Sequence, residues 1–351
     1  MATLDEVVLS QGNHEAIDSL FKNAQGREYR NALYVAASKG SKETVDALLK
    51  ASANVNAQGG YHGNALQAVA YRGSKETVDT LLKAIAFEGS KETIDALLKA
   101  GTNINAQGGE YRNALQAAVY RGSKETIDAL LKASTNINAQ GGEYRNALYA
   151  VVYRNTAFKG SKETVDTLLK ASANVNAQGR YYRNSLQVVA FEGSKETVDA
   201  LLKASANVNT QGREYRNALY AAAYRGSKET IDTLLKAGAN INAQGGEYGN
   251  ALYVVVFEGS KETVDTLLKA GANVNAQGGY HGNALQAVAY RGSKETVDAL
   301  LKASANVNAQ GGEYRNALYI AVFEGSKETV DALLKASVNV NAQGGYYGNA
   351  L

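Results

Sequence analysis

The sequence predicts an all-α solenoid of about ten helix–turn–helix units, and three observations support this fold class. The string Gly-Ser-Lys-Glu-Thr-[Val/Ile]-Asp recurs along most of the chain. Around each copy, two short segments with helical apolar spacing alternate with a turn rich in Asn and Gly. Hydrophobic residues make up 45% of the 351 residues, which is enough for a packed interior. Because a short helical hairpin cannot bury its apolar face alone, neighbouring units must cover one another.

The spacing of the repeated string defines the unit. Successive copies are usually separated by 33 residues, but the separation is 16 residues between Gly73 and Gly89 and 38 residues between Gly122 and Gly160. The copies begin at Gly40, Gly73, Gly89, Gly122, Gly160, Gly193, Gly226, Gly259, Gly292 and Gly325.

One copy shows how each element is predicted. Asn250 is a good N-cap for a first helix over residues 251–257, and Gly259 can end this helix because glycine accepts the left-handed conformation. Ser260 is expected to cap a second helix, whose aliphatic residues fall on one face. The Asn- and Gly-rich residues 272–279 are expected to form a turn that projects from the stack.

This unit resembles an ankyrin repeat, whose familiar form is G-x-T-P-L-H-x-A-A-x-x-G-H-x-x-[VI]-x-x-L-L-x-x-G-A-x-[VI]-N. The T-P-L-H of that family is N-A-L-[QY] here, and G-H is G-S. The Thr–His hydrogen bonds between repeats that the resemblance implies are therefore expected to be missing, with Asn and Ser caps in their place. The variant is also similar to repeats of fungal ankyrin-repeat proteins. Matching positions in one copy are Leu252, Gly259, Val264, Leu267, Leu268, Gly271, Ala272, Val274 and Asn275.

We expect one solenoid over residues 1–351, with four irregularities. Residues 1–26 form a degenerate amino-terminal unit, and residues 344–351 begin a unit that is truncated. A half-unit defect near residues 80–90 predicts one continuous helix from about Lys75 to Phe87, which would mispack the stack there. An insertion near residues 154–158 predicts a lengthened helix or a bulged loop.

Composition excludes several function classes. The chain has no Cys and only three His, which argues against a thiolate nucleophile and against Cys- or His-based metal sites. Acidic pairs such as Glu229 and Asp232 recur in every copy and are interpreted as solvated helix faces, and His62 and His281 as surface positions of turn tips. The net charge of +3 is small for nucleic-acid or membrane attraction. We expect no enzymatic activity, no cofactor, no metal, no nucleic acid, no membrane contact, no small-molecule substrate and a cytoplasmic, intracellular location with the nucleus left open.

The tyrosines suggest where a partner would bind. They occupy three repeat positions: the turn tips, the position after N-A-L and the end of the first helix. In ankyrin-type stacks the tips and first helices line one concave side, and Tyr and Arg often dominate binding at protein interfaces. Alternatively, each tip Tyr packs over the next turn and only stabilises the stack. The partner-binding residues are predicted to be Tyr111, Arg112, Tyr144, Arg145, Tyr215, Arg216, Tyr248, Tyr314 and Arg315, together with the Tyr or Gln after N-A-L.

The last two residues of the first helices alternate in charge. Copies ending in Phe-Glu alternate with copies ending in Tyr-Arg, apart from the disturbed copy that ends in Phe158-Lys159. Since stacked helices lie about 8–10 Å apart, this pattern predicts a ladder of Arg–Glu pairs that fixes register. Duplication of a two-unit block would leave the same pattern. In the carboxyl-terminal half the pairs are Phe191-Glu192, Tyr224-Arg225, Phe257-Glu258, Tyr290-Arg291 and Phe323-Glu324.

The leading functional hypothesis is therefore a non-enzymatic scaffold that binds a protein partner through its concave face. A first alternative is the sensor segment of a larger fungal NOD-like, nucleotide-dependent receptor, although this sequence contains no G-x-x-x-x-G-K-[ST] motif. A second alternative is a truncated repeat array without a ligand.

Overall fold

The chain divides into two compact units, Met1–Arg180 (unit 1) and Tyr181–Leu351 (unit 2), and each is described by itself. The fold is that of a computed structural model. It describes residues 32–39, 42–51, 53–59, 63–72, 89–107, 113–141, 146–154, 161–179, 184–212, 216–245, 249–258, 260–312 and 316–342. These residues form 18 α-helices and four short strands.

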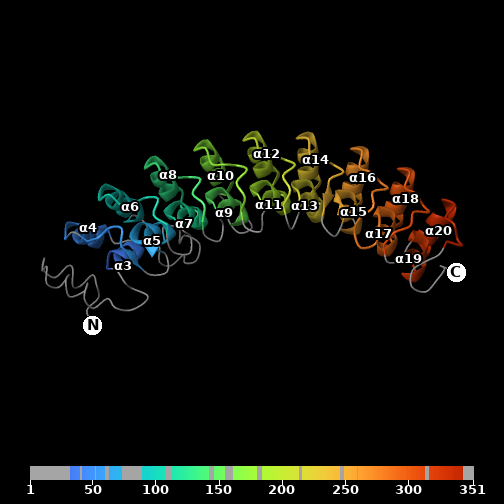
Figure 1. The fold of residues 1–351 in the computed structure, drawn as a ribbon, viewed down its shortest axis with the longest axis horizontal. Helices are drawn as coiled ribbons and strands as arrows, with labels where there is room; N and C mark the ends of the chain where they lie inside the picture. Colours follow the sequence, from blue (N-terminus) through green and yellow to red (C-terminus); the bar gives the residue numbers. More distant parts are fainter. Residues whose placement is uncertain are drawn as a thin grey trace. The chain divides into compact units, whose positions relative to one another are not determined.

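Unit 1 is a stack of helical pairs. Its first helices lie in one row and its second helices in another (Figure 1). Neighbours along each row are in contact, from α3 through α5 and α7 to α9 and from α4 through α6 to α8. The first helices are α3 (Ala32–Lys39), α5 (Ala65–Arg72), α7 (Ala114–Arg121) and α9 (Ala147–Arg154). The second helices are α4 (Lys42–Lys50), α6 (Gly89–Lys99), α8 (Lys124–Lys132) and α10 (Ser161–Lys170).

Unit 2 has the same organisation, with five described pairs. Each first helix contacts its own second helix and the first helix of the next pair. The first helices are α11 (Ser185–Glu192), α13 (Ala218–Arg225), α15 (Ala251–Glu258), α17 (Ala284–Arg291) and α19 (Ala317–Phe323). The second helices are α12 (Lys195–Lys203), α14 (Lys228–Lys236), α16 (Lys261–Lys269), α18 (Lys294–Lys302) and α20 (Lys327–Lys335). The predicted all-α repeat fold is thus confirmed.

The predicted Asn caps are confirmed. In α17, the Asn283 side chain accepts a hydrogen bond from the Gln286 backbone N–H at 3.0 Å. The Gln286 side chain accepts in return from the Asn283 N–H at 2.9 Å, which completes a capping box. Gly292 ends the helix with a φ of 71°, the left-handed conformation that glycine adopts without strain. The same Asn bond begins seven of the other first helices, at Asn64, Asn113, Asn146, Asn184, Asn217, Asn250 and Asn316.

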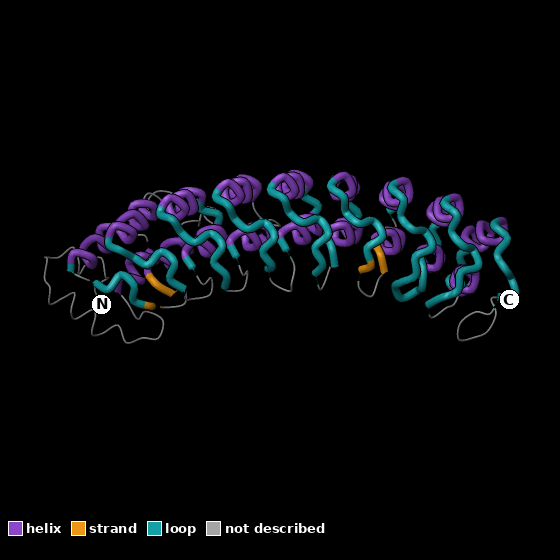
Figure 2. The backbone as a smooth tube through the Cα atoms, turned by 45° about the horizontal axis from the view of Figure 1, so that its top comes forward, coloured by secondary structure: helices purple, strands orange, loops and turns teal. Residues whose placement is uncertain are grey.

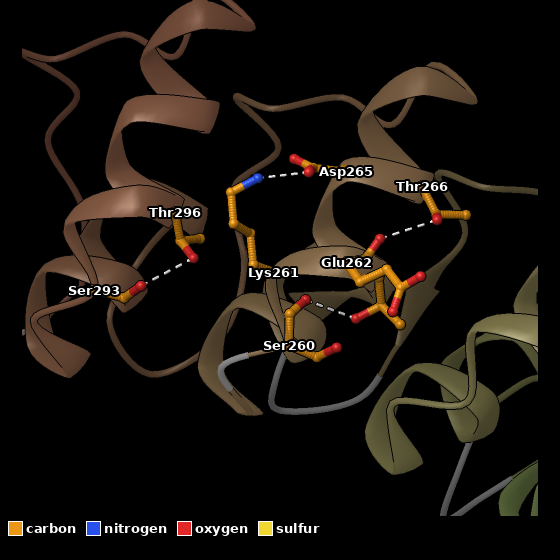
Figure 3. Close-up of polar contacts among 8 residues, drawn as sticks. Ser260, Lys261, Glu262, Asp265, Thr266, Ser293 and Thr296 are labelled. Atoms are coloured by element: carbon orange, nitrogen blue, oxygen red, sulfur yellow. Dashed lines mark hydrogen bonds and ion pairs between the residues drawn. The ribbon is translucent and has the colours of Figure 1, made fainter.

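The predicted Ser caps are confirmed in position, but their side chains make no capping hydrogen bond. Ser293 occupies the N-cap position of α18, but its side chain makes no capping hydrogen bond. Its hydroxyl donates instead to the Thr296 hydroxyl at 3.1 Å (Figure 3). Thr296 is buried, so its hydroxyl needs a partner inside the protein, and the serine supplies it. The same Ser–Thr bond occurs at Ser123, Ser194, Ser227 and Ser326.

The Asn-rich turns bond to one another along the stack. In unit 2, the Asn242 N–H donates to the Asn240 side-chain oxygen at 3.0 Å. The side-chain oxygen of Asn242 accepts from the Asn273 N–H of the next repeat at 2.7 Å. Beyond the turns, β1 (Gln58–Gly59) pairs with β2 (Gly63–Asn64), and β3 (Gln244–Gly245) pairs with β4 (Gly249–Asn250), each pair antiparallel (Figure 2).

The helices that flank the predicted half-unit defect stack regularly. The helices α5 and α6 contact each other as the two helices of one repeat, although residues 73–88 separate them. In addition, α6 contacts α4 and α8, and the Asn103 N–H donates to the Asn56 side-chain oxygen at 2.6 Å. The expected mispacking is therefore not found in the flanking helices. The continuous helix predicted from Lys75 to Phe87 lies outside the described residues.

The other irregularities are only partly described. Near the predicted insertion, α9 is described up to Arg154 and α10 from Ser161, so the lengthened helix or bulged loop stays a prediction. Most of the insertion near residues 154–158, the amino-terminal unit over 1–26 and the truncated unit over 344–351 lie outside the described residues. The single solenoid over residues 1–351 stays a prediction.

Deleting residues 73–88 should leave the stack intact. The deletion places Gly89 directly after Arg72, which restores the 33-residue spacing from Gly40 that the other repeats show. We expect an unchanged helical circular dichroism signal per residue and a urea midpoint that does not fall, because the flanking helices already pack together. Deleting the equally long segment 226–241, which contains α14, is the matched control and should lower the midpoint. Equal losses in the two variants would contradict the interpretation.

Candidate functional site

The residue after N-A-L links each first helix to the next turn. Where it is Gln, the side-chain amide donates to a carbonyl of the following turn: Gln116 to Ala139 at 3.1 Å and Gln286 to Gly311 at 3.0 Å. The equivalent bonds from Gln67 and Gln187 are also present. The sequence led us to expect that the Thr–His hydrogen bonds between repeats are missing. Glutamine supplies hydrogen bonds between repeats in their place.

Where this residue is Tyr, the ring packs against glycine of the next turn. A Cβ atom on Gly179 would lie 2.0 Å from Cδ2 of Tyr149, and one on Gly245 would lie 2.4 Å from Cδ2 of Tyr220. Five such tyrosines are buried: Tyr34, Tyr149, Tyr220, Tyr253 and Tyr319. The prediction that the Tyr or Gln after N-A-L faces a partner is therefore wrong, because these side chains fill the space between repeats.

Of the nine predicted tip residues, only Arg216 is described. Its side chain is exposed, and its backbone is left-handed with a φ of 52°. Its carbonyl oxygen accepts from the Gly212 N–H at 2.6 Å and from the Gln187 amide at 3.1 Å, so the base of this tip is fixed. The other eight lie outside the described residues: Tyr111, Arg112, Tyr144, Arg145, Tyr215, Tyr248, Tyr314 and Arg315.

The described tip Tyr280-His281 folds onto the first helices. The His281 ring stacks on Tyr290 of α17, with centroids 4.5 Å apart, and on Phe257 of α15 at 5.8 Å. The backbone N–H of His281 donates to the Tyr253 hydroxyl at 3.1 Å. His281 is only 5% exposed, so its predicted surface position is wrong, whereas Tyr280 is 60% exposed. A tip and the ends of two first helices thus form one continuous surface.

The last two residues of the first helices in unit 2 are exposed or half-buried, whereas most of the preceding helix residues are buried. We call Phe191-Glu192, Tyr224-Arg225, Phe257-Glu258, Tyr290-Arg291 and Phe323-Glu324 the helix-end row. Tyr224 is 43% exposed, Tyr290 38% and Phe323 57%. The charged residues Arg225, Glu258, Arg291 and Glu324 are exposed as well. This row combines aromatic rings with charges of alternating sign.

Contacts along the row repeat every second helix. Phe191 stacks with Tyr224 at a centroid distance of 6.0 Å, and Phe257 stacks with Tyr290 at 6.4 Å. In each pair the arginine that follows the tyrosine lies over the phenylalanine, with Cζ 5.4 Å from the Phe191 ring for Arg225 and 5.7 Å from the Phe257 ring for Arg291. Such cation–π contacts at exposed sites contribute about 0.5–1 kcal/mol.

The predicted ladder of Arg–Glu pairs is wrong for unit 2. Among the described residues of this unit, the ion pairs within 4.0 Å join lysines to acids of second helices, and none joins an arginine to a glutamate of the row. The arginines stack on rings instead. Burial raises the pKa of the half-buried Glu192 carboxyl above its ordinary value, and the nearby Arg225 charge offsets this only in part.

The second helices use their polar groups differently. The Lys261 ammonium pairs with Asp265 at 2.5 Å, and the Thr266 hydroxyl donates to the Glu262 backbone carbonyl at 3.0 Å (Figure 3). Lys294 pairs with Asp298 at 2.6 Å in the same way. Both ion pairs and the threonine hydrogen bond lie within single second helices.

Across the described ranges, no group of three or more His, Cys, Asp or Glu residues is arranged to hold a metal ion. None of the helices in these ranges combines the length and hydrophobicity that a membrane crossing requires.

The sequence predicted that the charges of the helix-end row alternate in sign, but we interpreted this alternation as ion pairs that fix the register between repeats. The missed feature is that these side chains stay exposed. The helix length could have indicated this exposure. A first helix of eight residues after the Asn cap places its last two residues beyond the six that are buried. Sequence alone could not show that a turn tip folds onto this row.

Comparisons with known proteins agree with the repeat fold. A family model described as ankyrin repeats (three copies) matches residues 6–88, 81–179, 154–245, 186–278 and 252–344. The crystal structure of the human ASB11 ankyrin repeat domain is similar, with a TM-score of 0.55 and 24% sequence identity. The similarity covers 64% of this chain and 98% of that domain, and at this identity it concerns the fold alone. Among curated proteins, none matches the chain.

Proposed function

Because the chain belongs to the ankyrin-repeat family, whose members are generally protein-interaction modules, we propose that it is a non-enzymatic scaffold that binds a protein partner. The binding surface is the helix-end row of unit 2 together with the turn tips beside it. The tip residues Tyr111, Arg112, Tyr144, Arg145, Tyr215, Arg216, Tyr248, Tyr314 and Arg315 are proposed to contribute to partner binding as well.

The exposure of aromatic and arginine side chains on the row carries this proposal. In α13 and α17, six successive residues are buried before the exposed Tyr224-Arg225 and Tyr290-Arg291 pairs. Tyrosine and arginine are enriched among the residues that contribute most to binding at protein interfaces. The neighbouring Tyr280, which is largely exposed, adds a further ring beside this surface. A stack that needed these rings only for its own packing would cover them.

The experiment compares two faces of the same chain. A partner captured on the full-length chain is identified by mass spectrometry, produced separately and titrated calorimetrically. Replacing Tyr224 and Tyr290 together by Ala should weaken binding by at least about tenfold, since each interface tyrosine commonly contributes more than about 1 kcal/mol. The control replaces Lys195 and Lys327, which are exposed on second helices, by Ala and should leave the affinity unchanged. Circular dichroism checks that both variants are folded.

A partner whose affinity is insensitive to the tyrosine variant, yet falls in the lysine variant, would contradict the proposed surface. If the tip residues contribute to partner binding, replacing Arg216 by Ala should weaken it further, although by less than the tyrosine pair.

A further inference from the structure

We propose that the helix-end row of unit 2 binds an extended polypeptide segment whose charge alternates at every third residue. An acidic residue of the segment would face each arginine of the row, and a basic residue would face each glutamate. This inference rests on the proposed function and names the chemistry of the partner.

The charges of the row are available to a partner. Arg225, Glu258, Arg291 and Glu324 follow one another on successive repeats, and all four side chains are exposed. None of them forms an ion pair within 4.0 Å with another described residue of unit 2. The two arginines lie over aromatic rings, which orients each guanidinium, and the Arg225 charge also acts on the nearby Glu192 carboxyl. Their order, positive then negative and repeated, complements a segment with the opposite order.

The spacing of the repeats fits an extended chain. Packed helices lie about 8–10 Å apart. Three residues advance a polyproline II segment by about 9 Å, and because this conformation has three residues per turn, every third side chain lies on the same side. Every third side chain of a segment in this conformation therefore meets the next helix end. A β-strand does not fit in this way, because its side chains alternate between two faces and every third one changes side. The sign of the segment's charge must change at each step to match the row.

The rings between the charges favour this kind of partner. Tyr224 and Tyr290 are partly exposed, and each precedes an arginine of the row, so they can contact the residues between the partner's charges. An amphipathic helix, in contrast, docks with a continuous apolar stripe in an apolar groove. The row places a charge at every repeat and therefore interrupts such a stripe.

The test uses fluorescently labelled synthetic peptides and the full-length chain. One peptide alternates Asp and Lys at every third position, with Ala, Gly and Ser between them. A second has the same composition with all Asp in one half, a third carries Lys at every charged position, and a fourth alternates Asp and Lys at every seventh position. In anisotropy titrations at low salt, the alternating peptide with the three-residue period should bind about tenfold more tightly than the others, and added salt should weaken this preference.

A charge reversal makes the expectation specific. Replacing Arg225→Glu and Arg291→Glu leaves only acidic residues along the helix-end row, so the preference should switch to the all-Lys peptide. The control variant, Lys195→Glu with Lys327→Glu, changes the net charge equally on second helices and should keep the wild-type preference. Both lysines lie at helix N-termini, where an acidic residue is favourable.

Two results would overturn the inference. One is an absence of preference for the three-residue alternation in the wild-type chain, including undetectable binding of all peptides. The other is an equal change of preference in the arginine and lysine variants. Either result would leave the proposed function standing if the captured partner still loses affinity on replacement of Tyr224 and Tyr290. Loss of that tyrosine effect would remove the proposed function itself.

Discussion

Replacing Gly312 by Ala should lower the free energy of unfolding by about 3 kcal/mol or more, through backbone strain and a steric clash. Gly312 has a φ of 65°, a left-handed conformation that costs any residue with a Cβ atom about 1–2 kcal/mol. The new Cβ would also lie 2.4 Å from the carbonyl carbon and 2.5 Å from the carbonyl oxygen of His281. These are backbone atoms of the preceding turn tip, so no side-chain rotation relieves the contact.

Gly325 provides a matched control for the strain alone. Its φ is 69°, nearly that of Gly312, and a Cβ atom added there would have no heavy atom within 4 Å. Gly325→Ala should therefore cost only about 1–2 kcal/mol. The difference between the two variants measures the contact between consecutive turn tips.

Urea unfolding followed by circular dichroism measures both losses. Because the stability of a repeat stack depends on interfaces between neighbours, the Gly312 variant should show an earlier transition for the helices carboxyl-terminal to the substitution. Equal losses in the Gly312 and Gly325 variants would show that the two tips do not press on each other.

Most of the fold could be predicted from the sequence because the residues that begin and end each helix act on backbone groups close to them in the chain. Asn283 caps α17 and Gly292 ends it, as the sequence pattern suggests, since both effects depend only on nearby backbone groups. The Ser293 hydroxyl could not be assigned in this way. It has two local choices, a backbone N–H or the Thr296 hydroxyl, and the burial of Thr296 by other helices decides between them.

Sequence spacing could not resolve the irregularity between Gly73 and Gly89. A separation of 16 residues can be counted as a repeat that lacks 17 residues or as a repeat that contains 16 additional ones. The contact of α5 with α6 and the Asn103–Asn56 hydrogen bond support the second count. Additional residues between two packed helices cost mainly loop-closure entropy, whereas mispacked helices lose buried apolar area on both sides.

The candidate site was predicted only in part because exposure depends on neighbouring repeats. Tyr149 and Tyr153 lie four residues apart in α9 and stack at 5.8 Å, yet the first is buried and the second is partly exposed. The next turn covers one ring and not the other. The sequence shows that these tyrosines occupy two different positions of the repeat. It does not show at which of the two positions the next turn covers the ring.

The contact between Tyr149 and Gly179 should behave as a coupled pair. Tyr149 is fully buried, so Tyr149→Ala should cost about 3–5 kcal/mol through lost apolar burial and a cavity. Gly179→Ala should cost about 1–3 kcal/mol, because its Cβ would lie 2.0–2.3 Å from three atoms of the Tyr149 ring. Both losses in the free energy of unfolding arise where the Tyr149 ring meets Gly179.

The double variant separates this contact from all others. Once the ring is gone, the added methyl group at position 179 meets no clash and fills part of the cavity, so Gly179→Ala should be neutral or slightly stabilising in the Tyr149→Ala chain. The loss in the double variant should then be smaller than the sum of the single losses by about 1–3 kcal/mol. Urea midpoints of the four chains give this coupling free energy directly. Additive losses would mean that the Tyr149 ring and Gly179 are not in contact.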